Sequence, residues 1–131
     1  MLLSLVLAAS LYSLPAPLHG DFDRDGLLDL ASFVGTRDGG QEIVIQWGGQ
    51  RRPDSVVVRL DPPGVLYPFL DTAIAGTFDT WCGKGGGSDD DPCPRTTVIL
   101  EGGELLFGQE ESALFVAIWT GDGFEVIQLS G

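Results

Sequence analysis

Short apolar stretches separated by turn residues follow one another along the chain from residue 27 onward. They are rich in β-branched and aromatic residues, which is typical of strands. No stretch of helical length combines a 3.6-residue apolar period with helix caps, although 68–76 is compatible with one helical turn. The strand candidates are 27–34, 42–47, 55–60, 72–78, 96–100, 104–107, 113–119 and 124–129. We therefore predict an all-β fold, a single small domain of about eight short, mostly antiparallel strands.

Three pairs of neighbouring candidates are predicted to form hairpins: 27–34 with 42–47, 96–100 with 104–107, and 113–119 with 124–129. The first pair surrounds the turn GTRDGG and the last surrounds TGDG, both rich in turn residues. The middle pair flanks Gly102-Gly103, a two-residue hairpin signal. The segment ALFVAIW of the last pair is apolar throughout, as expected of a strand covered on both faces.

The first fourteen residues, MLLSLVLAASLYSL, form an uncharged apolar run that Pro15 ends. A helix needs about 20 residues to cross a bilayer, so this run is too short. Its length suits the apolar region of a secretory signal, and the small residues Ala8 and Ser10 offer a cleavage site. We predict a signal peptide and short leader over 1–19, a folded domain over 20–131, and a periplasmic or secreted location. An N-terminal strand of the fold is the alternative for this run.

Two cysteines, Cys82 and Cys93, enclose the ten residues GKGGGSDDDP. In an oxidising compartment they are expected to close a surface loop with a disulfide, in agreement with export. A metal pair or a redox pair is less well supported, because there is neither a C-x-x-C spacing nor a neighbouring histidine. We interpret Asp89, Asp90 and Asp91 as a solvated acidic tip rather than a second cation site, because consecutive side chains point in different directions.

The stretch GDFDRDGLLDLA contains four candidate metal ligands. They are Asp21, Asp23, Asp25 and Asp29, spaced as D-x-D-x-D-G-x-x-D. A tight loop turns alternate side chains toward one centre, and a glycine after the third aspartate lets the backbone turn back. The Leu27 carbonyl is then expected to point inward. This arrangement follows the first nine positions of a calcium-binding loop.

Oxygen donors without histidine or cysteine suit Ca²⁺. Without a cation, four carboxylates so close together would repel one another, and some would protonate. The loop departs from an EF-hand because its twelfth position is Ser32 instead of a glutamate, and because a strand is predicted to follow. An acidic turn that only keeps a strand edge soluble is the alternative interpretation.

Residues 20–49, in which this loop precedes a strand, a glycine-rich turn and EIVIQWGG, resemble an FG-GAP or VCBS-type repeat. In that family the loop binds calcium between short strands, and several repeats usually build a propeller. The resemblance implies Ca²⁺ ligands at Asp21, Asp23, Asp25 and Asp29 through their side chains and at Leu27 through its carbonyl. This chain has a single such loop, so propeller-based functions do not transfer. Segments 82–87 and 111–131 look similar to the ends of small exported bacterial proteins that carry one loop of this kind.

Nineteen acidic residues against seven basic ones give a formal net charge of −12. This balance argues against nucleic acid or an anionic membrane surface as a partner, because both are recognised by clusters of lysine and arginine. It favours cations or a basic protein partner. Arg51-Arg52 is interpreted as a short basic turn, and Trp119, at the end of an apolar strand, as a core residue.

No nucleophile elbow, phosphate-binding loop, zinc pattern or plausible acid–base pair is present in the sequence, so we expect no enzymatic activity. The expected function is that of an exported, monomeric, calcium-binding β domain with a structural or binding role. The alternative is an acidic inhibitor or immunity-type protein that binds a basic enzyme outside the cytoplasm.

Overall fold

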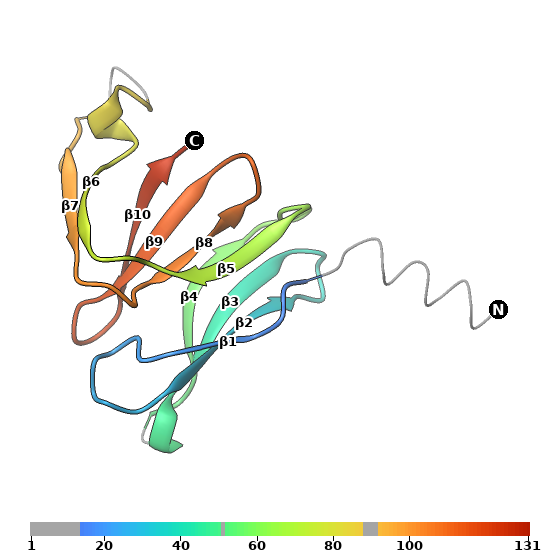
Figure 1. The fold of residues 1–131 in the computed structure, drawn as a ribbon. Coiled ribbons are helices and arrows are strands. Elements are labelled where there is room, and N and C mark those ends of the chain that lie inside the picture. Colours follow the sequence, from blue (N-terminus) through green and yellow to red (C-terminus); the bar gives the residue numbers. More distant parts are fainter. Residues whose placement is uncertain (1–13, 51, 88–91) are drawn as a thin grey trace.

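The computed structural model describes residues 14–50, 52–87 and 92–131, and these residues form antiparallel sheets (Figure 1). The all-β prediction is confirmed, as ten strands lie in the described part of the chain. The strands are β1 (Leu18–Gly20), β2 (Asp29–Gly35), β3 (Gln41–Gln46), β4 (Ser55–Leu60), β5 (Pro68–Thr72), β6 (Gly76–Asp79), β7 (Thr97–Leu100), β8 (Leu105–Gln109), β9 (Leu114–Trp119) and β10 (Phe124–Ser130). Two short 3₁₀ turns, η1 (Gly48–Gln50) and η2 (Cys82–Lys84), complete the elements.

The strands form three layers (Figure 1). The first sheet has the order β1-β2-β3-β4, and the central sheet has the order β10-β9-β8-β5. The pair β6-β7 forms the third layer. One apolar core joins the first sheet to the central sheet, and a second core joins the central sheet to β6-β7.

The first core follows from the alternating burial of β2 and β3. Alternate residues of a strand face the same side, so Phe33 lies beside Ile43 in the register and both are buried. Their counterparts on the central sheet include Leu105 and Phe107. This packing orients the first sheet, which carries the acidic loop, against the central sheet.

The second core contains Val98 and Leu100 of β7 together with Val116 and Leu129 of the central sheet. Val116 therefore faces one core while its neighbour Ala117 faces the other. This confirms the prediction that the apolar segment 113–119 is covered on both faces. The hairpins β2-β3 and β9-β10 also form as predicted.

The predicted hairpin around Gly102-Gly103 is wrong. β7 pairs with β6, and β8 pairs with β5 and β9, so the two strands belong to different layers. Both glycines have positive φ angles, of 99° and 91°. The buried Glu104 carboxylate accepts the N–H groups of Glu101 and Gly102, and the Gly103 N–H donates to the Ala73 carbonyl. These bonds turn the chain from one layer into the next.

The prediction of a single strand over 72–78 is also wrong, as is the possible helical turn over 68–76. The region contains the end of β5 in the central sheet and most of β6 in the third layer. The chain changes layer at residues 73–75, where Ala73 is buried in the second core. A local apolar pattern does not distinguish one strand from two strands that meet at a layer change.

The folded region begins before the predicted domain boundary at residue 20. Leu18 and His19 of β1 pair with Ala31 and Leu30 of β2, and Leu14 packs on the first core. The predicted export segment falls mainly on 1–13, which lies outside the described residues, as does the predicted acidic tip at 89–91. No helix in the described ranges is long and apolar enough to span a membrane.

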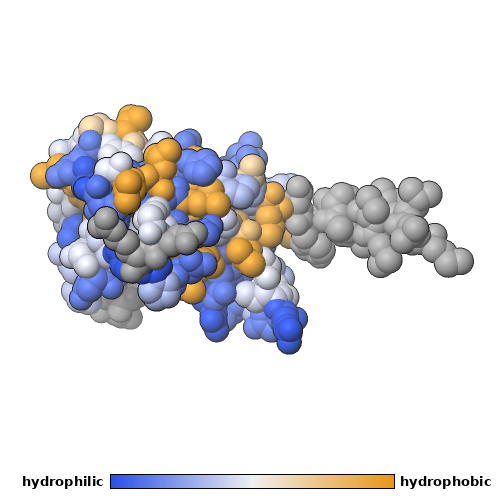
Figure 2. All heavy atoms as spheres, turned by 90° about the horizontal axis from the view of Figure 1, so that it is seen from below, coloured by the Kyte–Doolittle hydropathy of each residue, from blue (hydrophilic) through white to orange (hydrophobic). Residues whose placement is uncertain are grey.

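The surface seen in Figure 2 intersperses hydrophobic with hydrophilic side chains. Large apolar residues with more than half of their surface exposed include Leu28, Ile74 and Ile99. Apolar side chains that are exposed singly are common on soluble proteins. We therefore assign no function to them individually.

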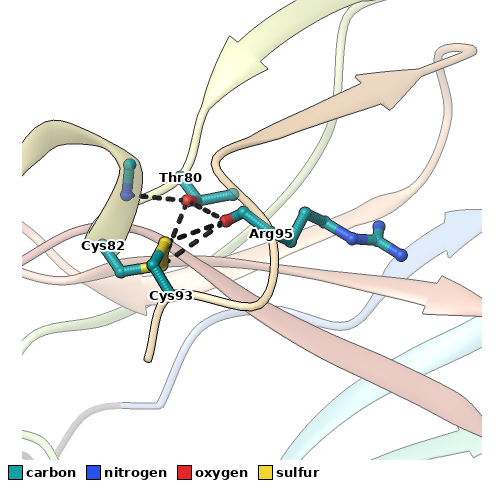
Figure 3. Close-up of a disulfide and its surroundings, with 5 residues drawn as sticks. Thr80, Cys82, Cys93 and Arg95 are labelled. Carbon is teal, nitrogen blue, oxygen red and sulfur yellow. Dashed lines mark hydrogen bonds between the residues drawn. A yellow bond between two sulfur atoms is a disulfide. The ribbon is translucent and has the colours of Figure 1, made fainter. Parts of the chain in front are cut away.

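The predicted disulfide between Cys82 and Cys93 is confirmed (Figure 3). Both sulfur atoms lie 3.4 Å from the Arg95 carbonyl oxygen. The buried Thr80 hydroxyl donates to the same oxygen at 2.6 Å and accepts the Gly83 N–H. An ion pair from Arg95 to Glu125 connects this region to β10.

Replacement of both cysteines by serine should lower the free energy of unfolding by about 3 kcal/mol, because the disulfide restricts the unfolded chain. Urea unfolding of the oxidised wild type and of the double variant measures the difference. Reductant should bring the wild type to the stability of the variant and leave the variant unchanged. Equal stability of the oxidised wild type and the variant would contradict the prediction.

Candidate metal centre

The acidic loop connects β1 to β2 and covers residues 21–28. Its reversal uses left-handed backbone at Arg24 and at Gly26, with φ angles of 61° and 87°. The loop is anchored by Phe22, which is buried in the first core. Gly20 leaves room for this ring, because a Cβ atom there would lie 2.7 Å from it. An aromatic anchor thus holds the start of the loop while the tip turns outward.

Three of the predicted ligands gather in the structure. One carboxylate oxygen from each of Asp21, Asp23 and Asp29 lies within 4.8 Å of the others. Asp25 is exposed and lies outside this trio, and its Oδ1 accepts the Leu27 N–H at 2.9 Å. The role of the Leu27 carbonyl as a ligand stays a prediction.

Asp29 is the most buried of these carboxylates, with 1% of its surface exposed. Its Oδ2 accepts the Phe22 N–H at 2.9 Å, and its Oδ1 accepts the Gly48 N–H at 2.8 Å. Gly48 follows β3, and a Cβ atom there would lie 2.4 Å from the Leu28 carbonyl oxygen. Asp29 therefore joins the beginning of the loop, the beginning of β2 and the end of β3.

Asp21 organises the tip of the loop. Its two carboxylate oxygens accept the Asp25 N–H at 3.1 Å and the Gly26 N–H at 2.8 Å. Backbone N–H donors thus wrap around one carboxylate.

The side chain of Asp23 is 3% exposed, and the Arg52 guanidinium donates to its Oδ2. Burial raises the pKa of Asp23 above its usual range, and the neighbouring carboxylates of Asp25 and Asp29 add to the increase. The pKa of Asp25 is lowered, mainly because its carboxylate accepts the Leu27 N–H. The loop therefore holds a carboxylate whose negative charge is costly unless a cation is close to it.

On its other side the loop contacts the turn between β7 and β8. Arg24 forms ion pairs with Glu101 at 2.7 Å and with the buried Glu104 at 3.3 Å. A cavity of about 110 Å³ lies at this junction, and its lining includes Asp21, Asp23 and Glu104. Ion pairs thus connect the acidic loop to the turn that leads into the central sheet.

Arg52 also belongs to this centre, although no local sequence pattern indicates it. Arg52 lies 29 residues from Asp23, in the connection between β3 and β4. Its guanidinium carbon is 4.1 Å from the ring centroid of Trp47 and 4.8 Å from that of Trp119. The core prediction for Trp119 is confirmed, since this side chain packs against the first core and edge-on against Trp47.

Comparisons of the chain with protein-family models, with curated proteins and with solved structures find no match. The resemblance to an FG-GAP or VCBS-type repeat therefore stays a prediction.

Replacement Asp29→Asn should destabilise the fold even when all divalent ions are chelated. The amide has one acceptor oxygen for two buried N–H donors, so one hydrogen bond is lost, at a cost of about 1–3 kcal/mol. Urea unfolding in the presence of EDTA measures this cost.

Asp25→Asn is the matched control, because the side chain is exposed and an amide oxygen still accepts the Leu27 N–H. Its effect should be below about 0.5 kcal/mol. Equal effects of the two replacements would show that Asp29 does not link the loop to β3.

Proposed function

We propose that this protein is an exported β domain that binds one Ca²⁺ in the loop between β1 and β2, and that the ion stabilises the fold. The observation that carries the proposal is the gathering of carboxylate oxygens from Asp21, Asp23 and Asp29 within 4.8 Å. The D-x-D-x-D-G spacing of the loop supports it independently.

The donor set fits a hard cation. The three side chains supply carboxylate oxygens, and neither histidine nor cysteine takes part. Ca²⁺ accepts six to eight such oxygens in flexible geometry, with carbonyl groups and water completing the shell. Zn²⁺ prefers nitrogen and sulfur ligands in tetrahedral arrangements, so it suits this centre less well.

A bound cation would act on the structure through the contacts of the loop. The loop is tied to the first core by Phe22, to the end of β3 by Asp29 and to the central sheet by Arg24. Ordering of the loop therefore favours packing of the first sheet on the central sheet. Because the unfolded chain has no such site, the binding free energy of the ion becomes folding free energy.

Export is consistent with this use of the ion. Calcium sites of extracellular modules typically have Kd values of about 10⁻⁴–10⁻³ M. This loop lacks the bidentate glutamate of an EF-hand, since Ser32 occupies the twelfth position. We therefore expect a Kd in that range. The free Ca²⁺ concentration outside the cell would be high enough to occupy such a site, whereas that of a calcium-poor cytosol would not.

Addition of Ca²⁺ to EDTA-treated protein should raise the melting temperature. At a free concentration 100 times the Kd the gain is about 2.7 kcal/mol, or about 10 °C for a domain of this size. Differential scanning calorimetry measures the shift, and isothermal titration calorimetry measures the uptake.

Asp23→Asn should abolish most of the shift, because it removes a carboxylate from the trio. Asp61→Asn, which removes an exposed charge after β4, should keep the shift and serves as the control. The proposal fails if the wild type shows neither a heat of Ca²⁺ binding nor a change in melting temperature.

A further inference from the structure

Arg52 places a positive charge in the acidic centre. Its guanidinium donates to Oδ2 of Asp23, one of the three carboxylates that gather in the loop. Arg52 comes from the connection between β3 and β4 and not from the loop itself. Its position is therefore independent of the local geometry that the aspartate spacing imposes.

The guanidinium is held by more than its charge. It lies over the rings of Trp47 and Trp119, where cation–π attraction stabilises it. Trp47 is itself buried, and its ring N–H donates to the Ser55 hydroxyl at 2.9 Å. The two tryptophan rings thus hold the Arg52 guanidinium in a position from which it contacts Asp23.

A guanidinium and a divalent ion make conflicting demands on Asp23. The guanidinium binds the carboxylate that Ca²⁺ would coordinate, and its positive charge repels the ion. When no metal is bound, the same guanidinium offsets the cost of burying the Asp23 charge. One residue is therefore expected to stabilise the metal-free fold and to weaken the binding of metal.

We propose that Arg52 is the internal counter-ion of the calcium loop: it neutralises Asp23 in the metal-free protein and lowers the affinity for Ca²⁺ by competing for that carboxylate. This inference rests on the proposed function, because it concerns the same site. It identifies Arg52 as the residue that sets the concentration range over which the loop responds to Ca²⁺.

The test is Ca²⁺ titration by calorimetry of the wild type and of Arg52→Gln. The variant should bind Ca²⁺ roughly tenfold more tightly, because the Coulomb repulsion between a single positive charge and a nearby divalent ion is removed. Arg52→Lys keeps the charge but loses the planar guanidinium that lies over the two rings, so its affinity should lie between those of the wild type and of Arg52→Gln.

Arg59→Gln is the matched control. Arg59 is an exposed arginine of β4 that pairs with Glu42 of β3, so its replacement makes the same change in net charge away from the loop. Its Ca²⁺ affinity should equal that of the wild type. A tenfold gain in Arg59→Gln as well would show that net charge alone is responsible, and would overturn the proposal.

Melting temperatures separate a counter-ion from a residue that only packs. In EDTA, Arg52→Gln should melt a few degrees below the wild type. In saturating Ca²⁺ the difference should shrink, because the bound ion then neutralises Asp23. Equal losses in both conditions, with unchanged affinity, would overturn the proposal and leave Arg52 a packing residue.

The two proposals fail in different ways. If the wild type binds Ca²⁺ and Arg52→Gln binds it no more tightly, only the counter-ion role is rejected. If the wild type does not take up Ca²⁺ but Arg52→Gln does, calcium binding by the native protein is rejected and the competition by Arg52 is supported. If neither binds, both proposals are rejected.

Discussion

The buried carboxylate of Asp29 is the constraint on which the acidic centre depends. A charge with 1% of its surface exposed is tolerated only where donors satisfy it, and here the N–H groups of Phe22 and Gly48 do so. These bonds hold the loop against the end of β3 and bring the carboxylates of Asp21 and Asp23 close to that of Asp29. The three carboxylates are thus close together because hydrogen bonds to Asp29 hold the loop against the first sheet.

The central sheet determines which segments surround the acidic centre. β8 and β9 contribute to both apolar cores, so the first sheet packs on one face and β6-β7 on the other. The turn that carries the chain from β7 into β8 lies beside the acidic loop, where Glu104 and Glu101 meet Arg24. Arg24 of the loop thereby contacts Glu104, 80 positions later in the sequence, at the point where the chain changes layer.

Four of the seven basic residues of this acidic chain join its parts. Arg24, Arg52, Arg59 and Arg95 each pair with a carboxylate of another segment. Pairs in which both side chains are exposed, such as Arg95 with Glu125, contribute little to stability. The pair of Arg52 with Asp23 differs, because the carboxylate is buried and the guanidinium lies over two tryptophan rings. Burial of one partner reduces the solvent screening of this pair.

The sequence by itself determined the features that depend on neighbouring residues. Alternation and turn chemistry predicted the hairpins β2-β3 and β9-β10, and cysteine spacing predicted the disulfide. The aspartate spacing predicted that carboxylates of the loop turn toward one centre, and those of Asp21, Asp23 and Asp29 gather there. Tertiary structure decided the partners of β7 and β8, because the burial of Val98 and Leu100 against the central sheet outweighs a local hairpin signal. It alone decided that Arg52 meets Asp23, which lies 29 positions away. No local pattern brings the two together; the packing of Trp47, which follows β3, on Trp119 of β9 does so.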